Sequence, residues 1–335
     1  MTYNVGDAIA VGTIEEPHVA VVAEGEAAKK IEGRSPWVLA WRRLRRDRAA
    51  MIALGVVVLI VLMALCAPLI ATILGHGVYQ QFRGTNPAGL SPTGQPVGPN
   101  STFWMGTDDQ GRDIFVRIAY GARISLFVGV VATAVTVAGG LVLGLAAGYF
   151  GGFVDSLIAR FFDWLLAVPF LLLAISLISV VTVHPIGPLK PGLPVVIVVL
   201  GFFGWAAVGR IVRGQVLSIR EKEYIEAARA LGARPWRIMF IDILPNLLAQ
   251  LIVYSTLLIP IAIVSEASLS FLGVGILPPT ADWGEMISTS QNYYLYGSWW
   301  YLVFPSLALL ITTLAFNIFG DGVRDAFDPR GDLFV

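Results

Sequence analysis

The chain has 335 residues, of which 56% are hydrophobic and only 14% are charged, and its formal net charge is zero. Soluble globular proteins carry about 25% charged residues, so this deficit indicates extensive lipid-facing surface. A neutral chain offers no basic field for nucleic acid, and we expect no nucleic-acid partner. The single cysteine, Cys66, excludes an intrachain disulfide. Three histidines lack metal-ligand spacing, so no metal site is expected: His18, His76 and His184.

The N-terminal region precedes the first long apolar run, which begins at Ala49. The apolar core of a secretory signal lies within roughly the first 15–30 residues, so we do not expect a cleaved signal. Residues 1–33 are predicted to be a flexible cytoplasmic tail. Residues 34–48 are predicted to form a basic amphipathic helix at the membrane interface, although a flank that only follows the positive-inside rule would explain the arginines equally well. The stripe that favours this helix consists of Trp37, Trp41, Leu44 and Arg48.

Six segments are long and apolar enough to approach the roughly 20 residues that a helix needs to cross a bilayer. We therefore predict an all-α polytopic membrane protein with a transmembrane domain over residues 49–320. The predicted helices lie near residues 49–73, 124–148, 160–183, 193–212, 246–272 and 299–320. Glycines recur every four residues in the second helix, a spacing that lets two helix backbones approach closely: Gly140, Gly144 and Gly148.

Six spans place both termini on the same side of the membrane. Most of the 23 lysines and arginines lie before the first span or between the fourth and fifth spans. By the positive-inside rule, both termini, the loop 213–245 and a C-terminal tail over 321–335 are expected to be cytoplasmic. The loop 75–110 is rich in Pro, Gly, Ser, Thr and Asn and is expected to be extracytoplasmic. It could contact another protein, but a structureless loop would explain its composition as well.

The densest polar stretch between spans begins with strong helix formers from Glu221 to Leu231. Ser218 stands three residues before Glu221, at the spacing of a capping box, and could start this helix. Gly232 follows where a left-handed residue would end it. The first part of the loop is therefore predicted to be a short, well-delimited helix.

A second short helix is predicted to start at Pro235, because proline suits the first helical position, and to end at Pro245, where the next span begins. Two short helices at an angle would form a cytoplasmic knob over residues 221–245. Such a knob fits a cleft on a soluble partner protein.

The order of residues in this knob resembles the EAA loop of ABC-importer permeases. Glu226-Ala-Ala is followed after three residues by Gly232 and later by Leu244-Pro245, while Asp242 replaces the isoleucine of the family pattern. The resemblance implies a type I importer permease with a loop that meets ATPase subunits. The residues expected to make that contact are Glu226, Ala227, Ala228, Gly232, Leu244 and Pro245.

Further stretches are similar to the C-subunit of dipeptide and oligopeptide permeases, so that the resemblance covers roughly residues 35–330. They are residues 104–113, 120–126, 266–275, 278–284 and 320–329. The resemblance implies a subunit of a prokaryotic inner membrane that forms half of a path for di- or oligopeptides or related solutes. Its implied partners are a homologous B-type permease, two ABC ATPases and an extracytoplasmic binding protein, besides membrane lipid.

The chain contains no Gly-x-x-x-x-Gly-Lys-Ser/Thr phosphate loop. ATP and Mg are therefore expected on the separate ATPase subunits, with no cofactor and no catalytic residue in this chain. The alternative is a secondary transporter driven by an ion gradient, but such proteins usually place ion sites near the midplane in inverted repeats, and no such repeat is evident. A membrane-embedded enzyme would need a nucleophile–base or metal constellation, and none is apparent.

Charged residues near the spans are candidates for function, because ionisable groups are costly at membrane depth. Arg160 and Asp163 are three residues apart near the start of the third span, beside Asp155, and are predicted to pair on one helix face. Glu266 follows a long uncharged run. It could line the translocation path, or it could hold the packing through hydrogen bonds. The acidic stretch 108–113 does not fit the EF-hand spacing and is predicted to be a glycine-bounded turn rather than a calcium site.

Overall fold

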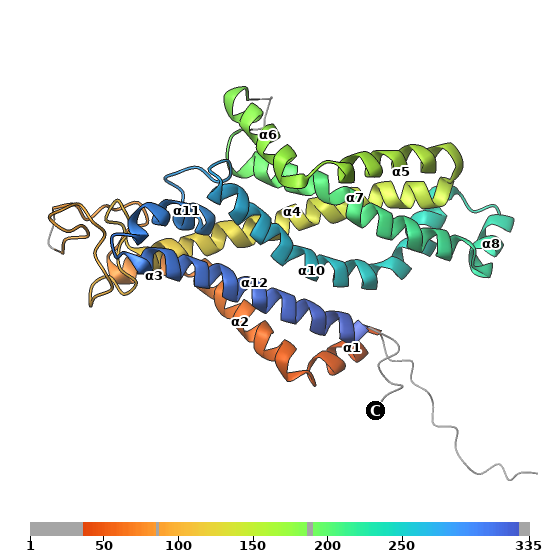
Figure 1. Ribbon diagram of the computed structural model, residues 1–335. Coiled ribbons are helices and arrows are strands. Elements are labelled where there is room, and N and C mark those ends of the chain that lie inside the picture. Colours follow the sequence, from red (N-terminus) through yellow and green to blue (C-terminus); the bar gives the residue numbers. More distant parts are fainter. Residues whose placement is uncertain (1–35, 85–86, 186–189, 328–335) are drawn as a thin grey trace, which may run out of the picture. The chain divides into compact units, whose positions relative to one another are not determined.

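The computed structural model describes residues 36–84, 87–185 and 190–327 (Figure 1). Helices joined by turns and loops make up these residues, and no strand occurs among them apart from two isolated bridges. The predicted all-α fold is therefore confirmed. The predicted tail over residues 1–33 lies outside the described part of the chain, as do residues 328–335.

The helices are α1 (Pro36–Leu44), α2 (Arg48–Leu65), α3 (Ala67–Leu74), α4 (Ile114–Phe150), α5 (Gly152–Ala167), α6 (Phe170–Val183), α7 (Leu193–Arg220), α8 (Glu223–Ala230), α9 (Pro235–Arg237), the π-helix η1 (Ile238–Ile243), α10 (Leu244–Phe271), α11 (Trp283–Tyr294) and α12 (Trp299–Phe327). Within the described residues, five helical segments are long and apolar enough to cross a membrane, and the bent pair α5–α6 would make a sixth span. This count agrees with the prediction of a polytopic membrane protein.

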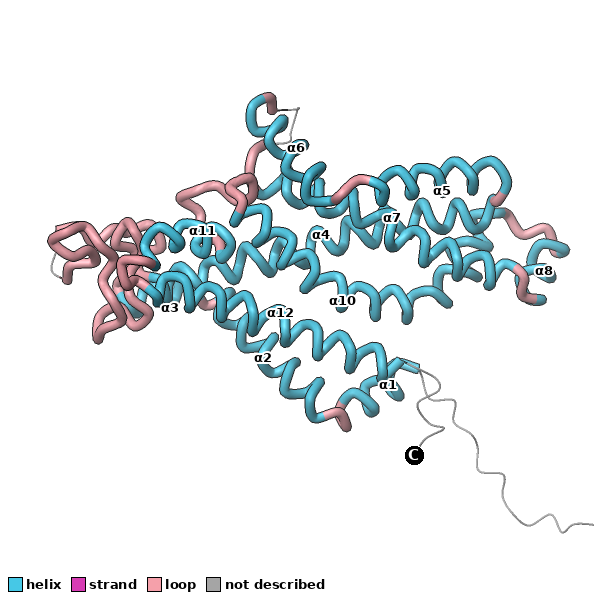
Figure 2. Tube along the Cα trace, viewed as in Figure 1, coloured by secondary structure: helices cyan, strands magenta, loops and turns pink. Residues whose placement is uncertain are grey.

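The third predicted span is broken rather than continuous. Helices α5 and α6 differ in direction by 89°, and Figure 2 shows the loop between them. Pro169 causes the break, because it has no N–H for the helix ladder and it forces Val168 into an extended conformation, with φ −92° and ψ 133°. The predicted single helix over 160–183 is therefore wrong at Pro169, and its start lies earlier, at Gly152.

The predicted helix over 34–48 is likewise divided. Helix α1 ends at Leu44, and Asp47 caps α2 by accepting hydrogen bonds from the N–H groups of Ala49 and Ala50. Leu44 is buried against residues of α12, whereas Trp37 and Trp41 remain about half exposed. The expected stripe of four residues is thus interrupted, because Asp47 starts a new helix before Arg48.

Helices α4 and α7 lie side by side along much of their length (Figure 1). The glycines of α4 make this approach possible. A Cβ atom at Gly144 would lie 2.6 Å from the carbonyl oxygen of Gly209, and Cβ atoms at Gly140 and Gly148 would clash with Val208 and Val216. The predicted close packing of the glycine stripe is confirmed, and its partner is α7.

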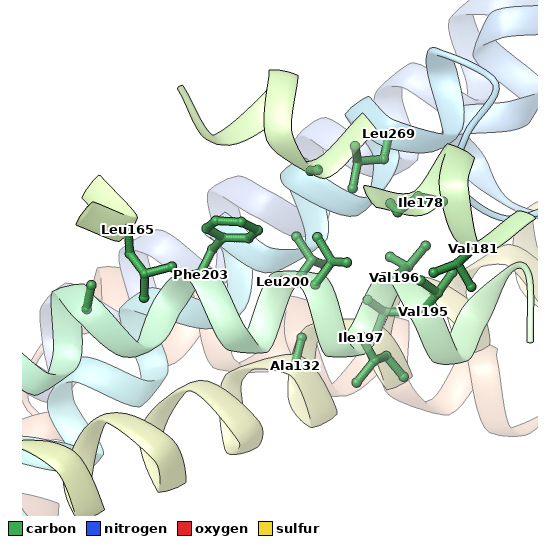
Figure 3. Packing of buried hydrophobic residues seen from close by; sticks show 14 of the residues in the cluster. Ala132, Leu165, Ile178, Val181, Val195, Val196, Ile197, Leu200, Phe203 and Leu269 are labelled. Carbon is green, nitrogen blue, oxygen red and sulfur yellow. The ribbon is translucent and has the colours of Figure 1, made fainter. Parts of the chain in front are cut away.

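An apolar cluster joins α7 to α4 and to the bent pair of helices α5 and α6. Ile178 and Val181 of α6 pack with Val195 and Val196 of α7, as Figure 3 shows. Further along α7, Leu200 and Phe203 lie with Ala132 of α4 and Leu165 of α5 in the same cluster. Through this packing, the residues on both sides of the break between α5 and α6 contact α7.

Further elements differ from the predicted ones. Helix α4 starts at Ile114 rather than near residue 124, because Asp113 caps its N-terminus. Helix α12 continues to Phe327, so the first part of the predicted tail over 321–335 is helical. Helix α11 was not predicted, and it packs between α10 and α12.

The loop between α3 and α4 is ordered where the structure describes it, so the structureless interpretation does not hold there. His76 Nδ1 lies 2.6 Å from Asp113 Oδ2, and the rings of His76, Phe82 and Phe103 pack together. Thr107 donates a hydrogen bond of 2.5 Å to the carbonyl oxygen of Gly89. These contacts tie the loop to the N-terminus of α4.

The acidic stretch 108–113 forms the predicted glycine-bounded turn. Asp108 accepts hydrogen bonds from the N–H groups of Gln110 and Arg112, and Gly111 has a φ of +73°. Asp109 accepts a hydrogen bond from Tyr301. Burial, together with the charge of Asp108, raises the pKa of Asp109. Asp108 and Asp109 also pair with the guanidinium of Arg112, at 2.6 and 3.8 Å, so these carboxylates have partners within the protein and fix the turn.

Replacing Asp113 with Ala is expected to lower the free energy of unfolding by about 1–2 kcal/mol. The change removes the hydrogen bonds that the carboxylate accepts from Phe115 and Val116 and also leaves His76 without its partner. Thermal unfolding of the purified protein in detergent measures the loss. An Asp113→Asn variant, which can still cap the helix, should recover most of it; a variant as unstable as the alanine one would contradict the capping role.

Candidate coupling site

The first helix of the knob is held by one buried anchor. Ile225 of α8 is fully buried, and it packs in a cluster with Ile238, Ile243 and the α7 residues Val212 and Val216. Apolar side chains buried this completely fix the orientation of a short helix that could not be stable alone. The knob is therefore attached firmly to α7.

Gly232 ends α8 with the predicted left-handed conformation, at a φ of +78°. The N–H of Ala233 donates a hydrogen bond to the carbonyl oxygen of Ala228 at 3.0 Å. The N–H of Gly232 donates one to the carbonyl oxygen of Arg229 at 2.9 Å. This pair of bonds is a Schellman motif. The prediction that Gly232 stops the helix is confirmed.

Ser218 does not cap α8, and the predicted capping box is wrong. Helix α7 continues to Arg220, so Ser218 lies inside it, and α8 begins at Glu223 after Lys222. The buried residue Val216 and its partly buried neighbour Ile219 pack in the same cluster as α8, which extends α7 beyond the boundary that local signals indicate.

Pro235 starts a helix as predicted, but Pro245 does not end it. The helical path runs from α9 through the π-helix η1 into α10 without a break. Proline has no N–H and crowds the preceding turn, and the wider turns of a π-helix relieve such crowding. The second part of the knob is therefore rigidly continuous with a membrane-spanning helix.

Several apolar side chains of the knob are exposed on its outer surface. Leu231 is 89% exposed, and four further side chains are about half exposed: Tyr224, Trp236, Phe240 and Ile241. Of the predicted contact residues, Glu226, Ala227, Gly232 and Pro245 are exposed, whereas Ala228 and Leu244 are partly buried in the anchoring cluster. Exposed apolar side chains on a rigidly anchored knob are available to a partner protein.

Residues 140–332 match the family of binding-protein-dependent transport system inner membrane components. This match covers more than half of the chain. The chain belongs to this family of transport permeases. Residues 35–92 also match the N-terminal transmembrane domain of oligopeptide transport permease C.

Curated relatives resemble the permease over nearly its whole length. It is 41% identical to the dipeptide transport system permease protein DppC of Bacillus subtilis (strain 168), over 87% of this chain and 85% of the relative. It is 40% identical to the oligopeptide transport system permease protein OppC of the same organism, over 94% and 96%. The glutathione transport system permease protein GsiD of Pectobacterium atrosepticum is 37% identical, over 89% and 92%. These matches identify an ABC importer permease that resembles the C-subunit type, a multi-pass inner-membrane protein.

Ion pairs connect α5 of the permease to α7, just before the knob. Asp155 is bound by the guanidinium of Arg213 through both of its oxygens, with Nη2 2.7 Å from Oδ2. Asp163 pairs with Arg210 at 2.5 Å. The predicted pairing of Asp163 with Arg160 is therefore wrong, because α7 brings a better-placed arginine to the same carboxylate.

Basic residues also tie the end of α7 and the knob to the end of α4. Arg220 donates hydrogen bonds to the carbonyl oxygens of Gly148 and Tyr149, at 3.2 and 3.4 Å. The guanidinium of Arg229 lies 5.4 Å from the centre of the Tyr149 ring. The last turn of α4, with its partial negative charge, is thus complemented by cations. The knob and α4 are connected by contacts that local sequence signals did not indicate.

Replacing Asp155 with Ala is expected to lower the free energy of unfolding by about 1–2 kcal/mol, between the values for exposed and buried pairs. The reason is that Arg213 keeps its charge but loses a two-oxygen partner in a half-buried position. Thermal unfolding in detergent provides the measurement. Exchanging the two residues, as Asp155→Arg with Arg213→Asp, should recover part of the loss; equal instability of the exchanged variant would count against the pair.

Glu266 is fully buried where α4, α10 and α11 meet. Its carboxylate accepts hydrogen bonds from Ser270 at 2.8 Å and from Ser125 at 3.4 Å. Asp282, which caps α11, lies beside it, and burial raises the pKa of Asp282. These contacts favour the packing interpretation of Glu266, and a place on the translocation path stays a prediction.

Proposed function

We propose that this permease forms half of a translocation path for short peptides and couples it to ATP hydrolysis through the knob. The observation that carries the proposal is a helix–turn–helix with an exposed apolar surface that is continuous with one membrane-spanning helix and anchored on a second. A partner that grips Leu231 and its neighbours would move α7 and α10 together, because Ile225 and the η1–α10 helix leave little freedom between them.

The proposed partners are two ABC ATPase subunits, a homologous B-type permease and an extracytoplasmic binding protein. ATP and Mg would be bound by the ATPases, and this chain would be a non-catalytic subunit. We further propose that both termini and the knob are cytoplasmic, which the distribution of lysines and arginines favours. The ordered loop between α3 and α4 would then face the binding protein.

Peptides are the proposed solutes because relatives that cover most of the chain are named as dipeptide, oligopeptide and glutathione transport permeases. All three kinds of solute are short chains of amino-acid residues joined by amide bonds. Related solutes of similar size would use the same path.

ATP-driven uptake by the intact importer in proteoliposomes tests the proposal. The complex would be assembled from this permease and the products of its neighbouring genes, with the binding protein outside and a labelled tripeptide as solute. We expect uptake that requires ATP and does not respond to dissipation of ion gradients. Uptake that persists without ATP and stops when the proton or sodium gradient is removed would favour the secondary transporter instead.

A further inference from the structure

A cavity of about 490 Å³ lies near mid-span between α4, α7, α10 and the break between α5 and α6. Pockets that hold small molecules measure roughly 300–1,000 Å³. Its walls are mainly apolar, with Leu165, Leu200 and Phe203 among them (Figure 3). None of the described residues that line it is charged. The cavity is therefore large enough for a small uncharged group.

One hydroxyl in this cavity lacks a partner. Thr133 is only 4% exposed, and its Oγ1 makes no hydrogen bond to any described residue. Threonines in helices commonly bond to the carbonyl four residues earlier, as Thr312 does to Ala308 at 2.7 Å. A buried hydroxyl without a partner is unfavourable. Thr133 lines the cavity, and a rotation about its χ1 bond, which exchanges the enclosed hydroxyl with the methyl group, would present the hydroxyl to a molecule there.

Open backbone provides a second polar feature of the same cavity. Val168, Pro169 and Phe170 line it at the 89° break, and no side chain caps the N-terminus of α6. The first N–H groups of a helix and the last carbonyls of the preceding helix have no intrahelical partner. At membrane depth, such backbone is tolerated where it is buried in protein or lines a water-filled cavity.

Resting on the proposed function, we infer that this cavity is a transient site for the transported peptide. The hydroxyl of Thr133 and the open backbone beside Pro169 bind the donors and acceptors of the peptide's amide groups, while the apolar walls accept an uncharged side chain. No charged group in the cavity pairs with the peptide termini, which stay outside it in water, so binding is weak and tolerant of sequence. A path requires this weakness, because a solute must leave as readily as it enters.

The first test removes the hydroxyl without changing the size of the side chain, through Thr133→Val. Uptake of trialanine and of trialanine methylated at its central amide nitrogen is compared in the intact importer. The wild-type and Thr133→Val importers use the same binding protein, so a difference between their uptake ratios for the two peptides must come from the permease. We expect Thr133→Val to reduce the preference for the unmethylated peptide about three- to tenfold, the equivalent of one hydrogen bond. The control Thr312→Val, also buried, should keep the wild-type ratio.

The second test fills the cavity, through Ala207→Trp, with Ala138→Trp on the exposed surface of α4 as the control. We expect Ala207→Trp to assemble with its partner subunits and to lose about tenfold or more of peptide uptake, while the control stays near wild type. Unchanged uptake would show that the cavity lies off the path. Loss of the second permease from the purified complex would show instead that a partner helix fills the cavity.

A wild-type importer that takes up no peptide under ATP would overturn the proposed function and this inference with it. A wild-type importer that takes up peptide, with both Thr133→Val and Ala207→Trp behaving like it, would overturn the inference alone.

Discussion

A permease carrying Gly232→Asp is expected to insert and assemble but to lose about tenfold or more of its ATP-driven uptake. The left-handed conformation costs most L-residues roughly 1–2 kcal/mol and costs Asp, like Asn, less, while a negative charge at the C-terminal end of α8 adds about 0.3–1 kcal/mol. A Cβ atom at Gly232 would meet nothing within 4 Å. The effect therefore comes from the altered helix end and the added charge, both at the exposed surface of the knob.

Two variants separate these causes. Gly232→Asn keeps the size of aspartate without its charge and adopts the left-handed conformation comparatively easily, so we expect the mildest loss. Gly214→Asp places the same charge on α7, at a glycine that also has open space but does not need a positive φ. Wild-type uptake by Gly232→Asp at wild-type expression would contradict the assigned role of this residue.

A permease carrying Gly144→Val is expected to fail to accumulate as a folded protein. A Cβ atom at this position would lie 2.6 Å from the carbonyl oxygen of Gly209 and 2.8 Å from Cβ of Val212. Overpacking of a core costs about 1–3 kcal/mol when side chains can move, but here a backbone atom of α7 is in the way. The helices must separate, and the contact between α4 and α7 is lost.

The yield of monodisperse protein after detergent extraction measures this loss. Gly55→Val is the matched control, because Gly55 lies in the membrane-spanning helix α2 and a Cβ atom there would meet nothing within 4 Å. We expect a normal yield from the control and little or no folded protein from Gly144→Val. Equal yields would mean that α4 and α7 do not depend on the glycine stripe.

Much of the fold was predictable from local patterns. The apolar runs indicated the spans, the four-residue spacing of Gly140, Gly144 and Gly148 indicated close packing, and Gly232 indicated the end of α8. Each signal acts within a few residues, where propensity and sterics decide the outcome. The partner of the glycine stripe was not predictable, because it depends on which helix α4 meets.

The effect of each proline on its helix could not be predicted from the local sequence alone. Pro169 breaks a helix, whereas Pro260 and Pro305 lie inside the continuous helices α10 and α12. Pro245 likewise does not interrupt the helical path, which passes through the π-helix η1 just before it. The four residues have the same local effect on hydrogen bonding, so the difference comes from the tertiary packing that restores or replaces the lost bond. The cavity beside Pro169 could not be predicted for the same reason.

The pairing of charges depended on tertiary structure as well. Asp163 has Arg160 three residues away in its own helix, yet it binds Arg210 of α7. Pairs within one helix contribute only about 0.2–0.5 kcal/mol, and exposed pairs between helices contribute similarly little, so the outcome depends on where packing has placed each arginine. Opposite charges at matching ends of neighbouring spans were the signal that could have found this pair.

Photo-crosslinking from the knob tests the central claim most directly. p-Benzoylphenylalanine would replace Leu231, which is 89% exposed, in the assembled and active importer, and Trp104, which is 58% exposed in the loop between α3 and α4, would serve as the control position. We predict an adduct between the permease and an ATPase subunit from position 231 and none from position 104. An importer that is active in ATP-driven uptake but yields no ATPase adduct from position 231 would contradict coupling through this knob.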